Sequence, residues 1–268
     1  MVIPQSIIFF GVTFHTYGLI LGISGVLSVQ LAKYAAVRAS ISSVLVQKYI
    51  VVAIIGGVLG ARLWHVFTDW PLYANEYVSI LKIWNGGLSI IGALIGLFVG
   101  LSIYQYFRRR LARETVSLLA LADVVALSLP IGQAVGRFAN YINQEVYGLP
   151  TQLPWGIFIS SVSRVRGYEQ FTRFHPLFAY EALVMLTVGC VLWYLHRSSA
   201  KQWSIGRGNL GIVYIWTYGA ARVLLDFLRI GIARYGSLGL SLNQVFLLLL
   251  LATVSVFALR PRGKKVYE

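Results

Sequence analysis

Residues 239–259 read GLSLNQVFLLLLLATVSVFAL, a stretch without a single Asp, Glu, Lys or Arg. A helix of about 20 mostly apolar residues is long enough to cross the hydrocarbon core of a bilayer. This stretch therefore predicts a transmembrane helix. The whole chain has the same character, because 57% of its 268 residues are hydrophobic, only 12% are charged, and the mean hydropathy is +0.72. A soluble domain carries about 25% charged residues, so the composition indicates a membrane protein.

Further apolar stretches of similar length occur at residues 16–36, 49–68, 87–107, 116–135, 177–195 and 209–228. We therefore expect an all-α polytopic membrane protein with seven transmembrane helices, which forms a single integral-membrane domain over residues 1–268. The longest connection, residues 136–176, contains Pro and Gly residues and the short apolar run WGIFI. We expect it to form a small outer cap with one or two strands.

The basic residues indicate how the chain is oriented. If the N-terminus lies outside, the segments on the inner side hold 14 of the 23 Lys and Arg residues. The positive-inside rule then favours an outer N-terminus and an inner C-terminus. Basic runs such as Arg108–Arg110 are interpreted as topology anchors beside anionic membrane lipids, and no nucleic-acid partner is expected from the net charge of +14.

Polar residues gather at the outer ends of the predicted spans, whereas the inner ends carry only basic anchors. Polar groups inside a membrane are costly, and by default they indicate function. The one-sided distribution favours a site in the outer leaflet over a conduction path. Helical spacing places four polar residues on one helix face: Tyr218, Arg222, Asp226 and Arg229. The arginines at this level would form an arginine-rich outer pocket of Arg62, Arg137, Arg222 and Arg229. Planar guanidinium groups suit phosphate, so a phospholipid head group is the expected ligand.

Several of these features also have a purely structural interpretation. Arg222 and Asp226 can form a structural ion pair, and Tyr17 and Tyr180 can be interfacial aromatic residues. Gly56, Gly57, Gly60, Gly92 and Gly96 are interpreted as helix-packing surfaces, and Asp123 is given no role. The sequence has no metal-ligand spacing and no serine-hydrolase motif, so neither a metal nor another cofactor is expected.

At these motifs the sequence resembles the bacterial prolipoprotein diacylglyceryl transferase family, over nearly the whole chain. The run Gly136–Glu145, GRFANYINQE, carries the most specific part of the resemblance. The other matching pieces are HTYGL at 15–19, GAR at 60–62, IWNGGLS at 83–89, HP at 175–176, YE at 180–181, YG at 218–219 and DFLR at 226–229. The family also has seven spans with the N-terminus outside.

The resemblance implies that the diacylglyceryl group of phosphatidylglycerol is transferred to the lipobox cysteine thiol in the signal peptide of a prolipoprotein. It places the protein in the bacterial cytoplasmic (inner) membrane, with the active site toward the outer leaflet. The candidate catalytic residues are Arg222, Tyr17 and Asp226. The candidate substrate-binding residues are Arg137, which would bind the lipid phosphate, and Asn140, Asn143, Glu145, His175, Tyr180, Glu181 and Arg229.

One position departs from the family pattern. Members usually have a histidine where this chain has Ile91, and isoleucine cannot transfer a proton. His15 and His175 are the histidines near the outer ends of spans that could substitute. Two alternatives to the transferase therefore stay open: a divergent, inactive homologue that binds lipid or signal peptide, and, less favoured without internal repeats, a transporter.

Overall fold

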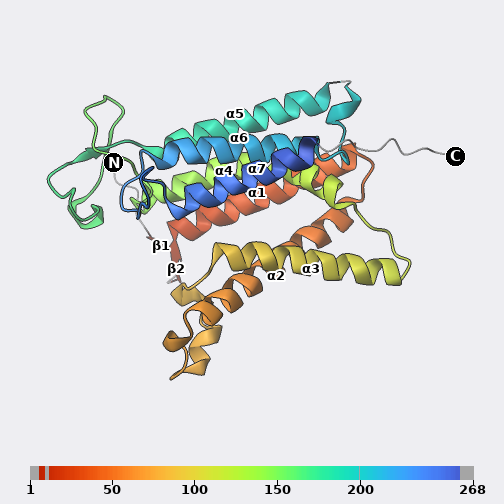
Figure 1. The fold of residues 1–268 in the computed structure, drawn as a ribbon, viewed down its shortest axis with the longest axis horizontal. Helices are drawn as coiled ribbons and strands as arrows, with labels where there is room; N and C mark the ends of the chain where they lie inside the picture. The colour runs from red at the N-terminus through yellow and green to blue at the C-terminus, as the bar shows by residue number, and fades with distance from the viewer. Residues whose placement is uncertain (1–5, 10–11, 199, 260–268) are drawn as a thin grey trace. The chain divides into compact units, whose positions relative to one another are not determined.

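Seven long helices make up most of the chain in the computed structural model, which describes residues 6–9, 12–198 and 200–259 (Figure 1). They are α1 (Thr16–Arg38), α2 (Ser43–Thr68), α3 (Ile90–Arg110), α4 (Leu118–Ile142), α5 (Leu177–Arg197), α6 (Asn209–Asp226) and α7 (Leu242–Leu259). The strands are short: β1 (Ser6–Phe9) pairs with β2 (Val12–His15), and β3 (Ile157–Phe158) pairs with β4 (Arg173–Phe174), both antiparallel. The all-helical class predicted from the sequence is confirmed.

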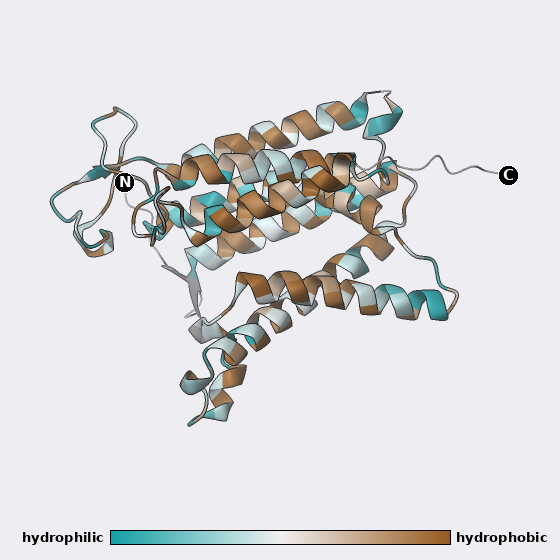
Figure 2. Cartoon of the chain, viewed as in Figure 1, coloured by the Kyte–Doolittle hydropathy of each residue, from teal (hydrophilic) through white to brown (hydrophobic). Residues whose placement is uncertain are grey.

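Within the described part of the chain, six of these helices are long and apolar enough to cross a membrane: α1, α2, α3, α4, α5 and α7. Hydrophobic residues make up most of their lengths, and hydrophilic residues concentrate toward helix ends and loops (Figure 2). The remaining helix, α6, coincides with the predicted stretch 209–228 but carries Arg222 and Asp226 in its last turns. These helices make the chain a polytopic membrane protein.

Two helices begin or end well outside the predicted boundaries. α2 begins at Ser43 instead of residue 49, because the Ser42 side chain caps it by accepting a hydrogen bond from the Leu45 amide at 3.3 Å. α4 continues to Ile142, beyond the expected end at residue 135. The extension makes most of the signature run, Gly136–Glu145, helical.

The structure divides into two compact units, residues 1–31 with 119–268, and residues 32–118. In the second unit, α2 and α3 cross at glycines. A Cβ atom added at Gly56 would lie 2.6 Å from the carbonyl oxygen of Gly96, and Gly60 faces Gly92 in the same way. The helix-packing interpretation of these glycines is confirmed, because the two backbones approach too closely for any side chain. Gly57 differs, since an added Cβ would make ordinary contact at 3.6 Å.

Arg62 has a structural task within this unit. Its buried guanidinium donates hydrogen bonds to the carbonyl oxygens of Ile80 at 2.8 Å and Gly86 at 2.7 Å, and also to those of Ser79, Lys82 and Gly87. The expectation that Arg62 belongs to an arginine-rich phosphate pocket is therefore wrong. All its N–H donors are occupied by carbonyl oxygens of the loop between α2 and α3.

In the first unit, Asp123 fixes the beginning of α6. The side chain is fully buried and accepts hydrogen bonds from the backbone amides of Gly206 at 2.9 Å, Gly208 at 2.7 Å and Gly211 at 3.0 Å. A carboxylate suits this position because the first amides of a helix lack intrahelical partners and carry partial positive charge. Asp123, which the sequence left without a role, thus attaches the start of α6 to α4.

The loop between α4 and α5 contains the predicted strands. β3 and β4 pair through Ile157 with Phe174 and Phe158 with Arg173. A small hydrophobic cluster of Tyr147, Ile159, Phe174 and Ile230 supports the pair. The backbone of residues 148–149 bonds both to His175 and to Leu228, which follows α6. The loop therefore connects the beginning of α5 to the end of α6.

Candidate functional site

The turn that ends α4 determines how the polar side chains of the signature run are oriented. The amide of Glu145 bonds to the carbonyl oxygen of Asn140 at 2.9 Å, and the amide of Gln144 bonds to that of Tyr141 at 3.0 Å. This is a Schellman motif, with Gln144 in the left-handed position at a φ of 52°. Non-glycine residues adopt this conformation at a cost and frequently at functional sites. The turn brings Glu145 back over the last turn of α4.

A polar chain runs across this helix end. Asn140 Nδ2 donates to Glu145 Oε1 at 2.7 Å, and Arg137 Nη1 lies 3.5 Å from Asn140 Oδ1. Tyr17, in the first turn of α1, interacts with Glu145 and lies within electrostatic range of Arg137. The structure thus brings together four of the predicted site residues at the end of α4.

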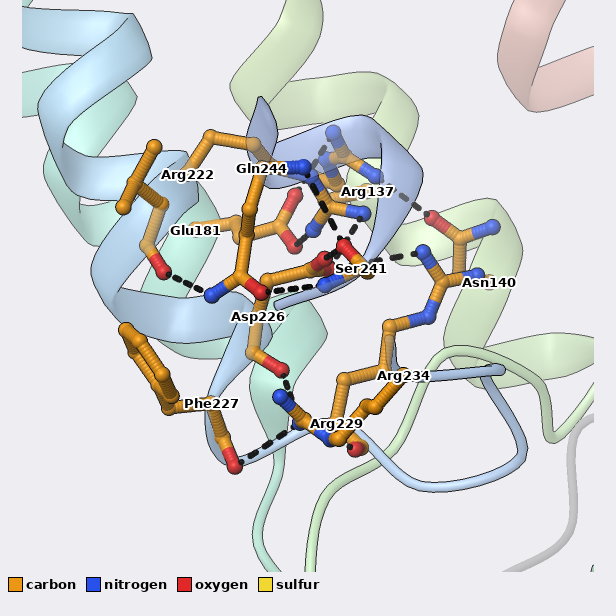
Figure 3. Close-up of polar contacts among 11 residues, drawn as sticks. Arg137, Asn140, Glu181, Arg222, Asp226, Phe227, Arg229, Arg234, Ser241 and Gln244 are labelled. Carbon is orange, nitrogen blue, oxygen red and sulfur yellow. Dashed lines mark hydrogen bonds and ion pairs between the residues drawn. The ribbon is translucent and has the colours of Figure 1, made fainter. Parts of the chain in front are cut away.

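Glu181 connects this chain to α6. The side chain comes from the second turn of α5 and is buried. Its Oε2 atom lies 2.6 Å from Arg137 Nη2, and its Oε1 atom accepts a hydrogen bond from Arg222 Nη1. One carboxylate therefore holds two arginines that are far apart in the sequence (Figure 3).

Asp226 and Arg229 complete the cluster beyond Arg222. Asp226 Oδ1 lies 3.5 Å from Arg222 Nη2 and 3.8 Å from Arg229 Nη1. The predicted pairing of Arg222 with Asp226 is confirmed, although Glu181 is the closer partner of Arg222. Among the described residues, neither Asp226 Oδ1 nor Glu181 Oε2 receives a well-directed hydrogen bond. Both atoms hold their arginines through charge.

The buried part of the cluster carries more positive than negative charge. Three arginines, Arg137, Arg222 and Arg229, surround two buried carboxylates, while the third acid, Glu145, is exposed. Burial lowers the pKa of the Arg229 guanidinium, and repulsion from Arg222 lowers it further, against the attraction of Asp226. Arginine stays charged nonetheless, so an anion at the open edge of the cluster would relieve this excess. Side-chain exposures of 20% for Arg137 and 29% for Arg229 mark that edge.

Apolar residues border the arginines on one side. A narrow cleft between α5 and α6 is lined by Glu181 and Arg222 at its polar end, and by Val184, Met185, Tyr218, Ala221 and Leu225. Guanidinium groups beside an apolar wall suit a ligand with an anionic head and a hydrocarbon body. The side chains at this edge are therefore of the kind that suits a phosphate ester of an apolar molecule.

Three predicted binding residues are not part of this network. His175 Nδ1 lies 3.0 Å from the hydroxyl of Tyr180, which also accepts a hydrogen bond from Trp155 Nε1 at 2.8 Å. This second polar group lies at the beginning of α5. Asn143 is the C-cap residue of α4, and in the part of the chain that the structure describes its side chain makes no hydrogen bond. Their predicted roles in binding stay predictions.

Ile91 and His15 bear on the histidine that the resemblance leads us to expect. Ile91 lies in the first turn of α3. Its side chain is exposed, so it is not part of the hydrophobic core of its unit. His15 ends β2 and is exposed. Neither His15 nor His175 has a hydrogen bond or ion pair to an arginine of the cluster among the described residues.

Several residues that support the cluster were not among those predicted from the sequence. Ser241 Oγ donates to Asp226 Oδ2 at 2.7 Å, and Gln244 is fully buried beside it. Arg234 donates to the carbonyl oxygen of Asp226 at 2.7 Å and to that of Phe227 at 3.2 Å, and so caps the end of α6. The Ser-x-x-Gln spacing at the start of α7 is a readable signal, because it is typical of a capping box. Arg234 lies in an irregular loop, and no local pattern reveals its partners.

Comparison with known proteins agrees with the geometry. A family model described as prolipoprotein diacylglyceryl transferase matches residues 5–260. The chain is similar to the phosphatidylglycerol–prolipoprotein diacylglyceryl transferase of Trichormus variabilis, with 35% identity over 81% of this chain and 76% of that protein. Proteins of the same name are similar in Synechococcus elongatus, with 35% identity over 83% and 75%, and in Cutibacterium acnes, with 39% identity over 68% and 60%.

Proposed function

The chain belongs to the prolipoprotein diacylglyceryl transferase family, and from that premise we propose that its arginine–carboxylate cluster is the active site of a phosphatidylglycerol–prolipoprotein diacylglyceryl transferase. One observation carries the assignment to this site. Glu181 gathers Arg137 from α4 and Arg222 from α6, while Arg229 joins through Asp226 (Figure 3). Three arginines face two buried carboxylates, so the cluster suits one further anion, and the phosphate of phosphatidylglycerol would supply it.

The reaction is a substitution at carbon. The sulfur of the lipobox cysteine attacks the glyceryl carbon that carries the phosphate ester. A carbon–sulfur bond forms, the carbon–oxygen bond to phosphate breaks, and glycerol phosphate leaves with the bonding electrons. The thiol proton passes to the surrounding solvent or to the departing phosphate. Diacylglycerol thereby becomes a thioether on the prolipoprotein.

The arginines act on the leaving group. Negative charge grows on the phosphate oxygen as the carbon–oxygen bond breaks, and preorganised donors that face this oxygen lower the barrier. Arg137 and Arg222 are held by Glu181, so little reorganisation is needed when the charge develops. Tyr17, Asn140 and Glu145 shape the side of the site at the end of α4. A thiol is already a good nucleophile, so alignment carries much of the rate.

The membrane arrangement is part of the proposal. All seven helices, α6 included, span the cytoplasmic membrane of a bacterium, with the N-terminus outside and the cluster in the outer leaflet. Support comes from the basic residues, since Arg108–Arg110 end α3 and Arg197 ends α5, both on the inner side in this orientation. Cysteine substitutions test it: with Cys190 replaced, Val162→Cys in the loop should react with an impermeant maleimide from outside, and Arg109→Cys should react only after permeabilisation.

Complementation tests the function. In a bacterium whose own transferase gene is repressed, expression of this chain should restore lipid modification of a reporter lipoprotein. The Arg137→Ala variant, inserted at equal level, should not restore it. A reporter whose lipobox cysteine is replaced by serine is the matched control. Failure of the unaltered chain to modify the reporter, despite normal insertion, would refute the proposed activity.

A further inference from the structure

The start of α7 is tied to the end of α6 by two buried polar side chains. Ser241 and Gln244 form a capping box: the Gln244 amide donates to Ser241 Oγ at 3.1 Å, and the Ser241 amide donates to Gln244 Oε1 at 2.9 Å. Only 4% of Ser241 and none of Gln244 is exposed. A capping box alone needs no burial, so each side chain has a second interaction that explains its position.

The hydroxyl group of Ser241 makes the first of these interactions. It accepts from the Gln244 amide and donates its own proton to Asp226 Oδ2 at 2.7 Å. Asp226 is 1% exposed and keeps its other oxygen, Oδ1, toward Arg222 and Arg229 at 3.5 and 3.8 Å. The serine therefore fixes the rotation of the carboxylate and holds it short of close contact with either arginine.

The amide group of Gln244 makes the second interaction. The last turn of α6 is tightened, because the Phe227 amide bonds to the carbonyl oxygen of Leu224 at 3.2 Å instead of to that of Val223. The Val223 oxygen has thereby lost its usual partner four residues on. Gln244 Nε2 donates to it at 3.0 Å. Gln244 thus fixes the turn of α6 that carries Arg222 and Asp226 (Figure 3).

We infer that Ser241 and Gln244 are positioning residues for diacylglyceryl transfer, which keep Asp226 from drawing Arg222 and Arg229 away from the lipid phosphate. The inference rests on the proposed function. Carboxylates and guanidinium groups prefer close, bidentate pairs. Without the Ser241 proton, Asp226 is free to rotate into such a pair, and the paired arginine then offers fewer donors to the leaving group. The two residues touch neither substrate, and they act through Asp226 and the backbone of α6.

A set of variants separates positioning from helix capping. Ser241→Gly keeps an accepted N-cap residue, at little cost to the helix, but has no hydroxyl. Ser241→Thr restores the hydroxyl. Gln244→Glu keeps the oxygen that completes the capping box and loses the donor to Val223. Asn243→Ala is the matched control, because Asn243 lies on the same turn and is exposed.

Steady-state transfer from phosphatidylglycerol to a lipobox peptide should distinguish these variants. Loss of a hydrogen bond to a charged group predicts that kcat of Ser241→Gly falls roughly tenfold or more, with a smaller change in KM. Ser241→Thr should recover most of kcat, Gln244→Glu should show an intermediate loss, and Asn243→Ala should match the unaltered chain. The thermal unfolding midpoints of Ser241→Gly, Ser241→Thr and Asn243→Ala should agree within a few degrees, whereas Gln244→Glu, which buries a carboxyl group, should unfold at a lower temperature.

Retention of phosphatidylglycerol during native mass spectrometry in detergent provides a readout that does not depend on turnover. Ser241→Gly should retain less of this lipid than Ser241→Thr. If the unaltered chain shows no transfer, the proposed function fails, and the lipid retention of the two variants still decides the inference. If Ser241→Gly equals the unaltered chain in both kcat and lipid retention, or if its losses follow a lowered unfolding midpoint, the inference is overturned.

Discussion

Among the individual residues, Glu181 is central, because its one carboxylate contacts two arginines. A guanidinium group has five N–H donors, more than one shared carboxylate can accept. Arg137 and Arg222 are therefore held in place by Glu181 while part of their donor set stays available. This arrangement explains how a site in an apolar protein can keep several positive charges close together before the phosphate arrives.

Arg137 is predicted to be indispensable. Its guanidinium lies at the exposed edge of the cluster, where the phosphate is proposed to bind. Arg137→Ala should lower transfer by roughly 10²–10³-fold, as is typical when one donor to a developing anion is lost. Arg137→Lys should restore only part of the activity, because an ammonium group cannot form the bidentate contact. Turnover near that of the unaltered chain in Arg137→Ala membranes would contradict the assignment.

Arg222 and Asp226 should differ in their importance. Arg222 faces the phosphate in this account, whereas Asp226 only orients its neighbours. Arg222→Ala should therefore lose activity severely, and Asp226→Ala should lose roughly tenfold, the range expected for a hydrogen bond to a charged group. Initial rates with equal amounts of inserted protein measure both. An inactive Asp226→Ala beside an active Arg222→Ala would reverse the roles.

The histidines are predicted to contribute little. Ile91 cannot act as a base, and neither His15 nor His175 is joined to the arginine cluster by a hydrogen bond or ion pair among the described residues. The double variant His15→Ala with His175→Ala should keep measurable transfer, and Ile91→His should leave the rate unchanged or raise it. Loss of a general base typically costs 10²–10⁴-fold. Complete inactivity of the normally inserted double variant would show that a histidine base is required.

At the scale of elements, α4 shows what local sequence could and could not reveal. Arg137 and Asn140 share a face, as helical spacing predicts, once the helix is known to continue to Ile142. The continuation was not expected from hydropathy, because Arg137 and Asn140 interrupt the apolar stretch, and a glutamine, Gln144, occupies the left-handed position of the terminal turn where glycine is usual. The return of Glu145 to Asn140 depends on that turn.

The crossing of α2 and α3 allows a matched pair of substitutions. Gly60 faces the backbone of α3, whereas Gly57 has room for a methyl group. Gly60→Ala should push the helices apart and lower stability by about 1–3 kcal/mol, the usual cost of overpacking. Gly57→Ala should be close to neutral. Thermal unfolding in detergent compares them, and equal midpoints for the two variants would refute the close approach.

At the scale of the whole molecule, hydropathy predicted the helices well and the partners of polar residues poorly. Six apolar helices follow from composition alone, since each is a long apolar stretch. Three pairings were missed: Arg62 with loop carbonyls, Asp123 with the start of α6, and Ser241 with Asp226, which join residues 18, 85 and 15 positions apart. Such contacts depend on tertiary packing, and a single sequence contains no period or spacing that encodes them.

The central claim is that this arginine cluster drives transfer of diacylglycerol from phosphatidylglycerol to a cysteine thiol. The most direct measurement uses purified protein in liposomes, a lipobox peptide, and phosphatidylglycerol whose head-group glycerol is labelled with carbon-13. Mass spectrometry should find one thioether-linked diacylglyceryl group for each labelled glycerol phosphate released, and roughly 10²–10³-fold slower formation of both products with Arg137→Ala. Formation of both products at the same rate by Arg137→Ala, or of neither by the unaltered protein, would contradict the account.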